Sequence, residues 1–402
     1  MTQRQGADSN IPKLRFPEFR DAGAWDEKTG NLIFDQVSNK QHNSDLPVLA
    51  ITQEHGAIPR NMIDYHVSVT SKSIGNYKVV EVGDFIISLR SFQGGIEYSE
   101  YKGICSPAYI ILRKRHKDVH DHFFKQFFKS ERFIQLLVKN LEGLRDGKMV
   151  SYKQFSEILL PIPAPPEQQK IANCLSSLDE LITTQSQKLD TLKTHKKGLM
   201  QQLFPAQGET VPKLRFPEFR NAGAWKEKQL EDACAMQAGK FVRASEIYEK
   251  SDGCLNPCYG GNGLRGFTKT FTHTGEFSLI GRQGALCGNI TLATGKFHAT
   301  EHAVVSTPQK GVDTNWLFYK LVNLNLNQYA TGQAQPGLSV DNLKRVPITI
   351  PKKKKEQQKI ADCLSSLDEL ITTQSQKLDT LKTHKKGLMQ QLFPSADEEA
   401  AG

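Results

Sequence analysis

Apolar residues recur along residues 167–205 in alternating steps of four and three, provided that Gln185 and Lys196 fill two of the positions. Steps of this kind are typical of a coiled-coil seam rather than of the wider apolar stripe of a surface helix. Pro165 and Pro166 suit the start of the helix, and Phe204-Pro205 suits its end. At about 1.5 Å per residue, the pattern predicts a helical rod of roughly 55 Å.

The same 39 letters return at residues 356–394, with Asn173 replaced by Asp362. Two seams in one chain are expected to pair with each other. We name the following residues as the seam and as the surface that docks partner subunits: Ile171, Leu175, Leu178, Ile182, Leu189, Leu192, Ile360, Leu364, Leu367, Ile371, Leu378 and Leu381.

A second repeat lies ahead of each helix. Residues 13–20 read Lys-Leu-Arg-Phe-Pro-Glu-Phe-Arg and recur as residues 213–220, and each copy leads through Ala-Gly-Ala to a tryptophan, Trp25 or Trp225. Residues 26–160 and 226–350, which lie between the repeats, share no such likeness. Two near-identical frames therefore carry two different inserts, which indicates one task performed twice on two targets.

The connectivity predicts the direction of the helices. The second insert joins the end of the first helix to the start of the second, and the ends of a domain tend to lie close together. We therefore expect antiparallel helices, with the second insert at one end of the rod and the first at the other. Gln185 and Gln374 fall near the middle of the helices. They either meet there as a polar register pin or are merely tolerated in the seam.

Each insert is expected to be a mixed, β-rich domain. Residues 84–89, 108–112, 277–280 and 303–306 read as strands, and residues 121–140 and 313–329 read as helices. Both inserts close alike, at residues 151–163 and 339–351, which indicates one fold with divergent surfaces. The predicted class is α+β, with pseudo-two-fold symmetry. The predicted segments are recognition domains at 11–163 and 206–353, helices at 164–205 and 354–394, and a disordered tail at 395–402.

Composition narrows the class of protein only a little. The chain has 402 residues, of which 38% are hydrophobic, and its mean hydropathy is −0.47. It has no apolar run that would span a bilayer and no signal peptide. Seven scattered cysteines fit reduced thiols in a cytosol. The net charge of +9 favours a polyanionic partner, but weakly.

Several fragments resemble catalytic motifs without the context that the chemistry needs. Residues 261–266 match G-x-G-x-x-G, but a strand-like segment follows where a dinucleotide site needs a helix. Residues 256–259, Asn-Pro-Cys-Tyr, depart from the Asn-Pro-Pro-Tyr of amino-methyltransferases. Residues 298–302 match H-x-x-E-H but lie between a glycine and a strand, so that Glu301 and His302 either hold a turn or face a ligand.

Two other sequence features, a set of cysteines and a run of lysines, each allow both a structural and a functional interpretation. Cys254 and Cys258, with Cys287 or His273, have the chemistry of zinc ligands, but buried small side chains are the more ordinary reading, and we expect no metal site. Lysines 352–355 are either a solvated charge run or a phosphate contact.

Polar, glycine-rich loops at residues 88–95, 281–289 and 332–337 remain. Arg and Gln are the side chains that read guanine and adenine edges, and glycines let a backbone approach phosphate. The leading candidates for DNA contact are Arg90, Gln93, Arg282 and Gln283, and Ser91 is included in the same predicted surface. Second choices are Lys148, Ser151, Tyr152, Lys153, Gln333 and Gln335. No catalytic residue is expected.

With these features together, the chain resembles the specificity (S, HsdS) subunits of type I restriction–modification enzymes. The resemblance rests on the 13–20 motif and its copy, and on the motif Pro-x-x-x-Glu-Gln-Gln-Lys-Ile-Ala at the start of each long helix. In the second copy of this motif, Lys352 replaces the proline. Within the inserts it rests on Ser88–Gly95, Tyr259–Gly263, Ile280–Gly288 and Ala299–Val304.

The resemblance implies a non-catalytic cytoplasmic subunit, bacterial or archaeal, in which each insert reads one half of a bipartite DNA target on opposite strands. The spacer helices would set the gap and dock two modification subunits, which hold AdoMet and methylate adenine. Restriction subunits would add cleavage using ATP and Mg. No cofactor is expected in this chain. The alternative is a coiled-coil scaffold that binds two protein ligands through its inserts.

Overall fold

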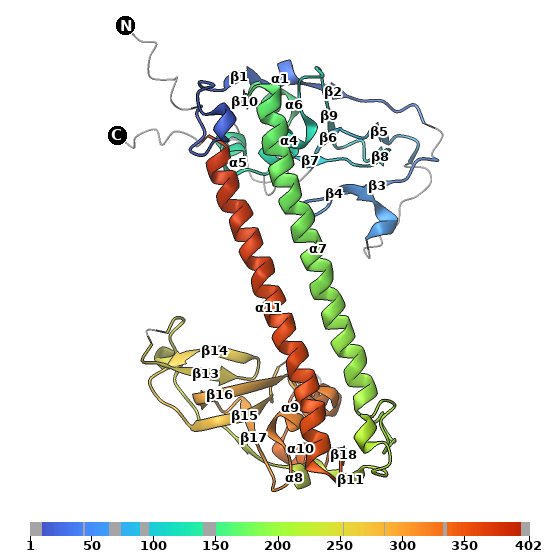
Figure 1. Ribbon diagram of the computed structural model, residues 1–402, viewed down its shortest axis with the longest axis vertical. Coiled ribbons are helices and arrows are strands. Elements are labelled where there is room, and N and C mark those ends of the chain that lie inside the picture. Colours follow the sequence, from blue (N-terminus) through green and yellow to red (C-terminus); the bar gives the residue numbers. More distant parts are fainter. Residues whose placement is uncertain are drawn as a thin grey trace. The chain divides into compact units, whose positions relative to one another are not determined.

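The structure is a computed structural model that describes residues 10–42, 45–63, 74–88, 96–139, 150–251, 253–284, 286–332 and 336–394. The chain divides into two compact units, shown in Figure 1. Unit 1 comprises residues 1–185 and 377–402, and unit 2 comprises residues 186–376. Both long helices, α7 (Pro165–Leu203) and α11 (Lys354–Leu392), contribute one half to each unit. None of the described helices combines the length and the apolarity needed to span a bilayer.

The insert of unit 1 is built on a four-stranded sheet with the strand order β2-β9-β6-β7. Its strands are β1 (Asp26–Thr29), β2 (Phe34–Val37), β3 (Leu49–Thr52), β4 (Gly56–Pro59), β5 (Lys78–Val80), β6 (Phe85–Ile87), β7 (Glu97–Tyr98), β8 (Gly103–Cys105), β9 (Ile110–Lys114) and β10 (Leu159–Ile162). Its helices are α1 (Gly30–Ile33), α4 (Asp121–Phe127), α5 (Glu131–Lys139) and α6 (Tyr152–Ser156), with short 3-10 turns at Pro17–Phe19 and Arg60–Met62.

The insert of unit 2 is built on a six-stranded sheet with the order β12-β17-β15-β16-β13-β14. Its strands are β11 (Lys226–Gln229), β12 (Cys234–Ala238), β13 (Asn256–Gly260), β14 (Gly263–Thr268), β15 (His273–Gly281), β16 (Ile290–Ala299), β17 (Ala303–Pro308) and β18 (Pro347–Ile350). Its helices are α8 (Leu230–Ala233), α9 (Thr314–Asn323) and α10 (Val340–Lys344), with 3-10 turns at Pro217–Phe219, Ala244–Glu246 and Leu326–Tyr329.

The two inserts share one core topology, as the sequence predicts. Across the sheet, β2, β9, β6 and β7 correspond to β12, β17, β15 and β16, and each set has the same order along the chain. Unit 2 adds the β13–β14 hairpin at the edge of that shared sheet. The divergence between the inserts therefore lies in what is attached to a common sheet.

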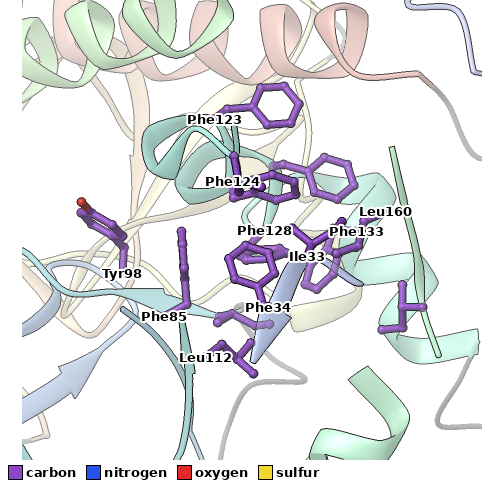
Figure 2. Packing of buried hydrophobic residues seen from close by; sticks show 14 of the residues in the cluster. Ile33, Phe34, Phe85, Tyr98, Leu112, Phe123, Phe124, Phe128, Phe133 and Leu160 are labelled. Atoms are coloured by element: carbon purple, nitrogen blue, oxygen red, sulfur yellow. The ribbon is translucent and has the colours of Figure 1, made fainter. Parts of the chain in front are cut away.

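Aromatic side chains fill the core of unit 1. Phe34 packs edge-to-face against Phe85 and Phe124, with ring centroids 5.5 and 5.2 Å apart. Figure 2 shows these rings together with Phe128 and Phe133, which lie 4.7 Å apart. Such pairs contribute about 0.5–1.5 kcal/mol beyond their area burial. In unit 2 the equivalent core is smaller in aromatic content and centres on Trp225 and Trp316.

In each insert, the first strand and the last strand lie side by side. Strand β1 pairs antiparallel with β10, so that Asp26 lies opposite Ile162. Strand β11 pairs in the same way with β18, and Lys226 lies opposite Ile350. The chain therefore leaves the frame and returns to it on adjacent strands, whatever the insert between them contains.

A buried ion pair ties the repeated Lys-Leu-Arg-Phe-Pro-Glu-Phe-Arg motif to the first turn of the long helix. The Arg15 guanidinium donates to both carboxylate oxygens of Glu167, at 2.6 and 2.7 Å, and these hydrogen bonds raise the pKa of Arg15. Arg215 donates to Glu356 in the same bidentate manner, at 2.7 and 2.8 Å. Both glutamates are 1% exposed. In unit 2 the indole of Trp225 also donates to Glu356, at 3.1 Å.

Within each unit the long helices run antiparallel, which confirms the predicted direction. In unit 1 the start of α7, including Ile171 and Leu175, shares a core with Leu392 at the end of α11. In unit 2 Leu203 near the end of α7 shares a core with Leu364 of α11. Every predicted seam residue is buried or half-buried. Gln374 is buried and Gln185 half-buried, and their meeting as a register pin stays a prediction, as does the placement of the inserts along the rod.

A matched polar contact fastens each insert to the helix pair. Asp179 of α7 accepts a hydrogen bond from Gln126 of α4 at 2.7 Å and pairs with Lys385 of α11 at 2.6 Å. Asp368 of α11, the copy of Asp179, accepts from Tyr319 of α9 at 2.6 Å and pairs with Lys196 of α7. The repeated aspartate thus joins three helices in each unit, although the inserts supply different donors.

The predicted strands are present at β6, β9, β15 and β17, but the two predicted helices are each interrupted. Residues 121–140 form α4 and α5, because the Ser130 hydroxyl bonds to the Phe127 carbonyl and accepts from the Phe133 amide, which starts a new helix. Residues 313–329 form α9 and a 3-10 turn, because Asn325 takes a left-handed conformation with φ of 47°. The division into domains given above stays a prediction.

Replacing Glu356 by Gln should destabilise unit 2. Arg215 would keep a buried charge without its anionic partner, and the loss of one member of a buried pair costs about 3 kcal/mol or more. The measurement is urea unfolding of the full chain. Glu18→Gln is the control, because Glu18 and its partner Lys170 are about half exposed and exposed ion pairs contribute little to stability. Equal effects of the two substitutions would contradict a structural role for the Arg215–Glu356 pair.

Candidate nucleic-acid interface

The glycine-rich fragment at residues 261–266 forms the tip of a β-hairpin rather than a cofactor loop. Strands β13 and β14 pair antiparallel, with Gly260 opposite Gly263, so that Gly261 and Asn262 make a two-residue turn. Gly263 has a φ of 88°, a conformation that glycine adopts without strain. The fragment therefore forms a hairpin turn that leads into strand β14, without the following helix that a dinucleotide site needs.

Two further loops lie against this hairpin tip. The amide of Arg282 donates to the His302 carbonyl at 3.0 Å, and the amide of Thr300 donates to the Tyr259 carbonyl at 2.9 Å. A Cβ added to Gly281 would lie 1.9 Å from the carbonyl oxygen of Gly261. Backbone contacts thus hold the hairpin, the start of the 281–289 loop and the 300–302 turn together. At Gly281 the backbones approach so closely that no side chain fits.

Residues 336–338, at the end of the third glycine-rich loop, join the same cluster. Gly284 donates to the Pro336 carbonyl at 3.0 Å, and Leu338 donates to the Arg282 carbonyl at 2.9 Å. Gln283 also forms an isolated bridge with Gly337. Four segments that are far apart in the sequence therefore meet at one surface of unit 2.

A cavity of about 530 Å³ opens between these loops. It is lined by Gly260, Gly261, Asn262, Gly263, Leu264, Arg265, Gln283, Gly284 and His302. Asn262, Arg265 and Gln283 are exposed, and His302 is half-buried with its Nε2 3.2 Å from Glu301. Amide and guanidinium groups on glycine-rich backbone supply the donors and acceptors that base edges and phosphates engage.

Three buried polar atoms beside the cavity have no hydrogen-bond partner among the described residues. They are Arg282 Nε, Thr300 Oγ1 and Glu301 Oε2. An unpaired buried polar atom carries a desolvation cost, so each is expected to gain a partner when a polar ligand or ordered water enters. Their position supports the loop cluster as a binding surface.

The predicted contact residues divide into three groups, of which the third, in unit 1, is described below. Arg282 and Gln283 lie in the loop cluster, and Gln283 lines the cavity. Arg90, Ser91, Gln93, Lys148, Gln333 and Gln335 lie outside the described residues. Asn262 and Arg265 are not among the contacts predicted from the sequence, although Asn262 belongs to a motif on which the family resemblance rests. For His302 the sequence predicts that it faces a ligand or holds a turn.

Ser151, Tyr152 and Lys153 of unit 1 lie at the start of α6. Ser151 caps that helix, accepting from the Gln154 amide, and the Tyr152 hydroxyl donates to the Phe34 carbonyl at 3.0 Å. Lys153 is exposed. The first two side chains thus have structural contacts, and a role of these three residues in DNA contact stays a prediction.

The two other fragments that resemble catalytic motifs, residues 298–302 and 256–259, lack the structure that the corresponding chemistry needs. His298, the first histidine of H-x-x-E-H, lies in strand β16 and is 5% exposed, with contacts to Thr270 Oγ1 at 2.9 Å and to the Lys240 carbonyl at 3.0 Å. The zinc-protease chemistry needs both histidines on one helix face, which a strand and a turn do not provide. Asn256-Pro-Cys-Tyr259 lies in strand β13. The described residues contain no group of three His, Cys, Asp or Glu side chains placed to hold a metal ion.

The fold and the loop cluster define a protein with two related recognition domains on a duplicated helical frame. Residues 27–194 and 223–383 match the family described as type I restriction modification DNA specificity domain. Because these matches cover most of the sequence, the chain belongs to this family, that of the specificity subunits of type I restriction–modification systems.

Relatives in sequence agree with this assignment, and a solved structure shares the fold. The chain is 44% identical to the type I restriction enzyme EcoprrI specificity subunit of Escherichia coli over 149 residues. These residues make up 37% of each of the two chains. It is 25% identical over 356 residues, 81% of either chain, to the type I restriction enzyme MjaVIII specificity subunit of Methanocaldococcus jannaschii. Its fold matches the crystal structure of the S subunit of a type I system from M. genitalium, with a TM-score of 0.64, 16% identity and coverage of 96% of this chain and 100% of that chain.

Substituting Gly281 by Ala should displace the hairpin tip and weaken DNA binding. The added methyl group would overlap the Gly261 carbonyl, whereas Gly337→Ala places its methyl group at an ordinary 3.5 Å from the Arg282 carbonyl and serves as the control. The measurement is the DNA affinity of the assembled complex, with circular dichroism to verify folding. Unchanged affinity in Gly281→Ala would show that the hairpin tip is not part of the binding surface.

Proposed function

We propose that each insert reads one half of a bipartite DNA target and that the loop cluster of unit 2 is the reading surface of the second half. The observation that carries the proposal is the meeting of the hairpin tip, the 281–289 loop and the 300–302 turn around a cavity lined by Asn262, Arg265 and Gln283. Side chains of these three types pair with adenine, guanine and phosphate groups.

The duplicated parts serve a different purpose in this proposal. The chain repeats 39 residues of helix with one change, so the two units present equivalent surfaces for two identical partners. Those partners are two modification subunits, which bind AdoMet and methylate adenine in each half-site, while restriction subunits with ATP and Mg add cleavage. The chain itself acts by recognition, without catalysis.

The match to a multi-subunit system supports this assembly. A chain from a structure described for complex assembly and conformational transition of the type I R-M system shares the fold, with a TM-score of 0.55 and 92% coverage of this chain. The net charge of +9 adds a favourable but unspecific attraction to DNA.

Removing the Gln283 side chain should relax one base position in one half-site. A side chain that pairs with a base edge contributes about 1–3 kcal/mol of discrimination. A complex of Gln283→Ala with its methyltransferase partner should therefore also methylate sites that differ at that position. The measurement is the methylated-adenine consensus from single-molecule sequencing of DNA treated with the chain and its methyltransferase partner. The control is Gln309→Ala, an exposed glutamine at the end of the same sheet. A change in the half-site that unit 1 reads, or an unaltered consensus, would refute this assignment of Gln283.

Lengthening both helices together should widen the gap between the half-sites. Seven residues inserted after Gln185 and after Gln374 keep the heptad phase and add about 10 Å of helix. At about 3.4 Å per base pair, that corresponds to roughly three further base pairs. The same sequencing assay reads the consensus, with the unmodified chain as the reference. A change in either half-site, rather than in the gap, would mean that the helices are not the ruler.

A further inference from the structure

Unit 2 contains a second cavity, of about 540 Å³, away from the loop cluster. It lies between the segment after α7, strands β11 and β18, and the end of α9. Its walls combine apolar groups, such as Leu324 and Ile348, with the polar side chains of Asn323, Gln328 and Tyr329. Mixed walls of this kind are typical of sites for small organic molecules.

The amine of Lys320 belongs to this cavity. Lys320 lines it, although the residue as a whole is only 4% exposed. No hydrogen bond or ion pair of its amine occurs among the described residues, and the Phe204 ring, 5.8 Å away, is the one aromatic contact recorded for it. Burial lowers the pKa of Lys320 to about 8, which leaves the amine mostly protonated near neutral pH. A buried cation without an anion is costly unless something else occupies the cavity.

The duplicated architecture shows that the fold does not need a lysine here. The amide of His120, at the start of α4, donates to Gln168 at 2.9 Å, and the amide of Asp313, at the start of α9, donates to Gln357, the copy of Gln168, at 2.8 Å. Counting seven residues from these equivalent points gives Phe127 in unit 1 and Lys320 in unit 2.

The surroundings support this equivalence. Phe127 packs on Phe393 with ring centroids 5.4 Å apart, and Lys320 lies over Phe204, which is the copy of Phe393. Phe127 is fully buried and completes the aromatic core of unit 1. The same frame position therefore accepts an apolar side chain, and the buried amine of unit 2 calls for an explanation other than packing.

We propose that this cavity binds a small organic monocarboxylate, whose carboxylate group pairs with the Lys320 amine. One buried cation matches one negative charge. Neutral donors such as Asn323, Gln328 and Tyr329 suit the remaining carboxylate lone pairs, and Leu324 and Ile348 suit an organic body.

The rim of the cavity argues against a dianion. Glu209 and Glu227 line the opening and are exposed, and the exposed Lys228 there is 3.7 Å from Asp232, which partly neutralises it. A doubly charged phosphate would meet twice the repulsion from these carboxylates that a monocarboxylate meets. The site is independent of DNA reading, because its residues are distinct from those of the loop cluster.

Amine footprinting of the full chain tests the proposal. The protein is acetylated with an N-hydroxysuccinimide ester, and the modification of each lysine is followed by mass spectrometry with sodium propionate, sodium benzoate or inorganic phosphate at constant ionic strength. Acetylation of Lys320 should fall about fivefold when a carboxylate probe is present at about four times its Kd. The exposed Lys310 should be unaffected and serves as the internal control.

Substitution provides the second measurement. Lys320→Phe copies the residue of unit 1, and Lys320→Met keeps an unbranched side chain in case the ring does not fit. Carboxylates should raise the melting temperature of the native chain but of neither variant. Phosphate protection equal to that of the carboxylates, or no protection and no melting shift with either carboxylate, overturns the proposal.

Discussion

The structure depends on the way each insert is closed. The entry and exit strands pair directly, and a buried bidentate Arg–Glu pair fixes the frame motif to the first turn of the long helix next to them. Because both ends of the insert are held by the frame, the loops of the insert can vary while the few contacts with the long helices are kept. Two inserts that have no sequence likeness can therefore occupy equivalent positions, and variation of the loops leaves the helical frame intact.

The same constraint explains which residues are repeated. Glu167 and Glu356, and Asp179 and Asp368, are identical in the two helices because each takes part in a contact that both units need. Their partners on the inserts differ in chemistry: Gln126 provides an amide and Tyr319 a hydroxyl for the same carboxylate. The frame thus specifies an acceptor, and each insert only has to place some donor opposite it.

Periodicity and repetition predicted the helices, their antiparallel pairing and the common core of the inserts, because these follow from short-range patterns and from connectivity. The helix breaks at Ser130 and Asn325 were missed, since they depend on one side-chain cap and one left-handed residue inside apolar stretches. For the binding surface, the sequence indicated the 281–289 loop through its Arg and Gln. It did not single out Asn262 and Arg265, because their nearness to Gln283 arises from contacts between segments about twenty residues apart.

The comparison between the units also separates residues that the frame requires from residues that it merely admits. Trp25 and Trp225 occupy equivalent places, yet the Trp225 indole donates to Glu356 while that of Trp25 has no partner among the described residues. The bidentate arginine is therefore the shared requirement, and the indole bond is an addition in unit 2. Applied to Phe127 and Lys320, the same reasoning assigns the buried amine to the chemistry of its cavity rather than to the fold, because the frame is complete with a phenyl ring in that position.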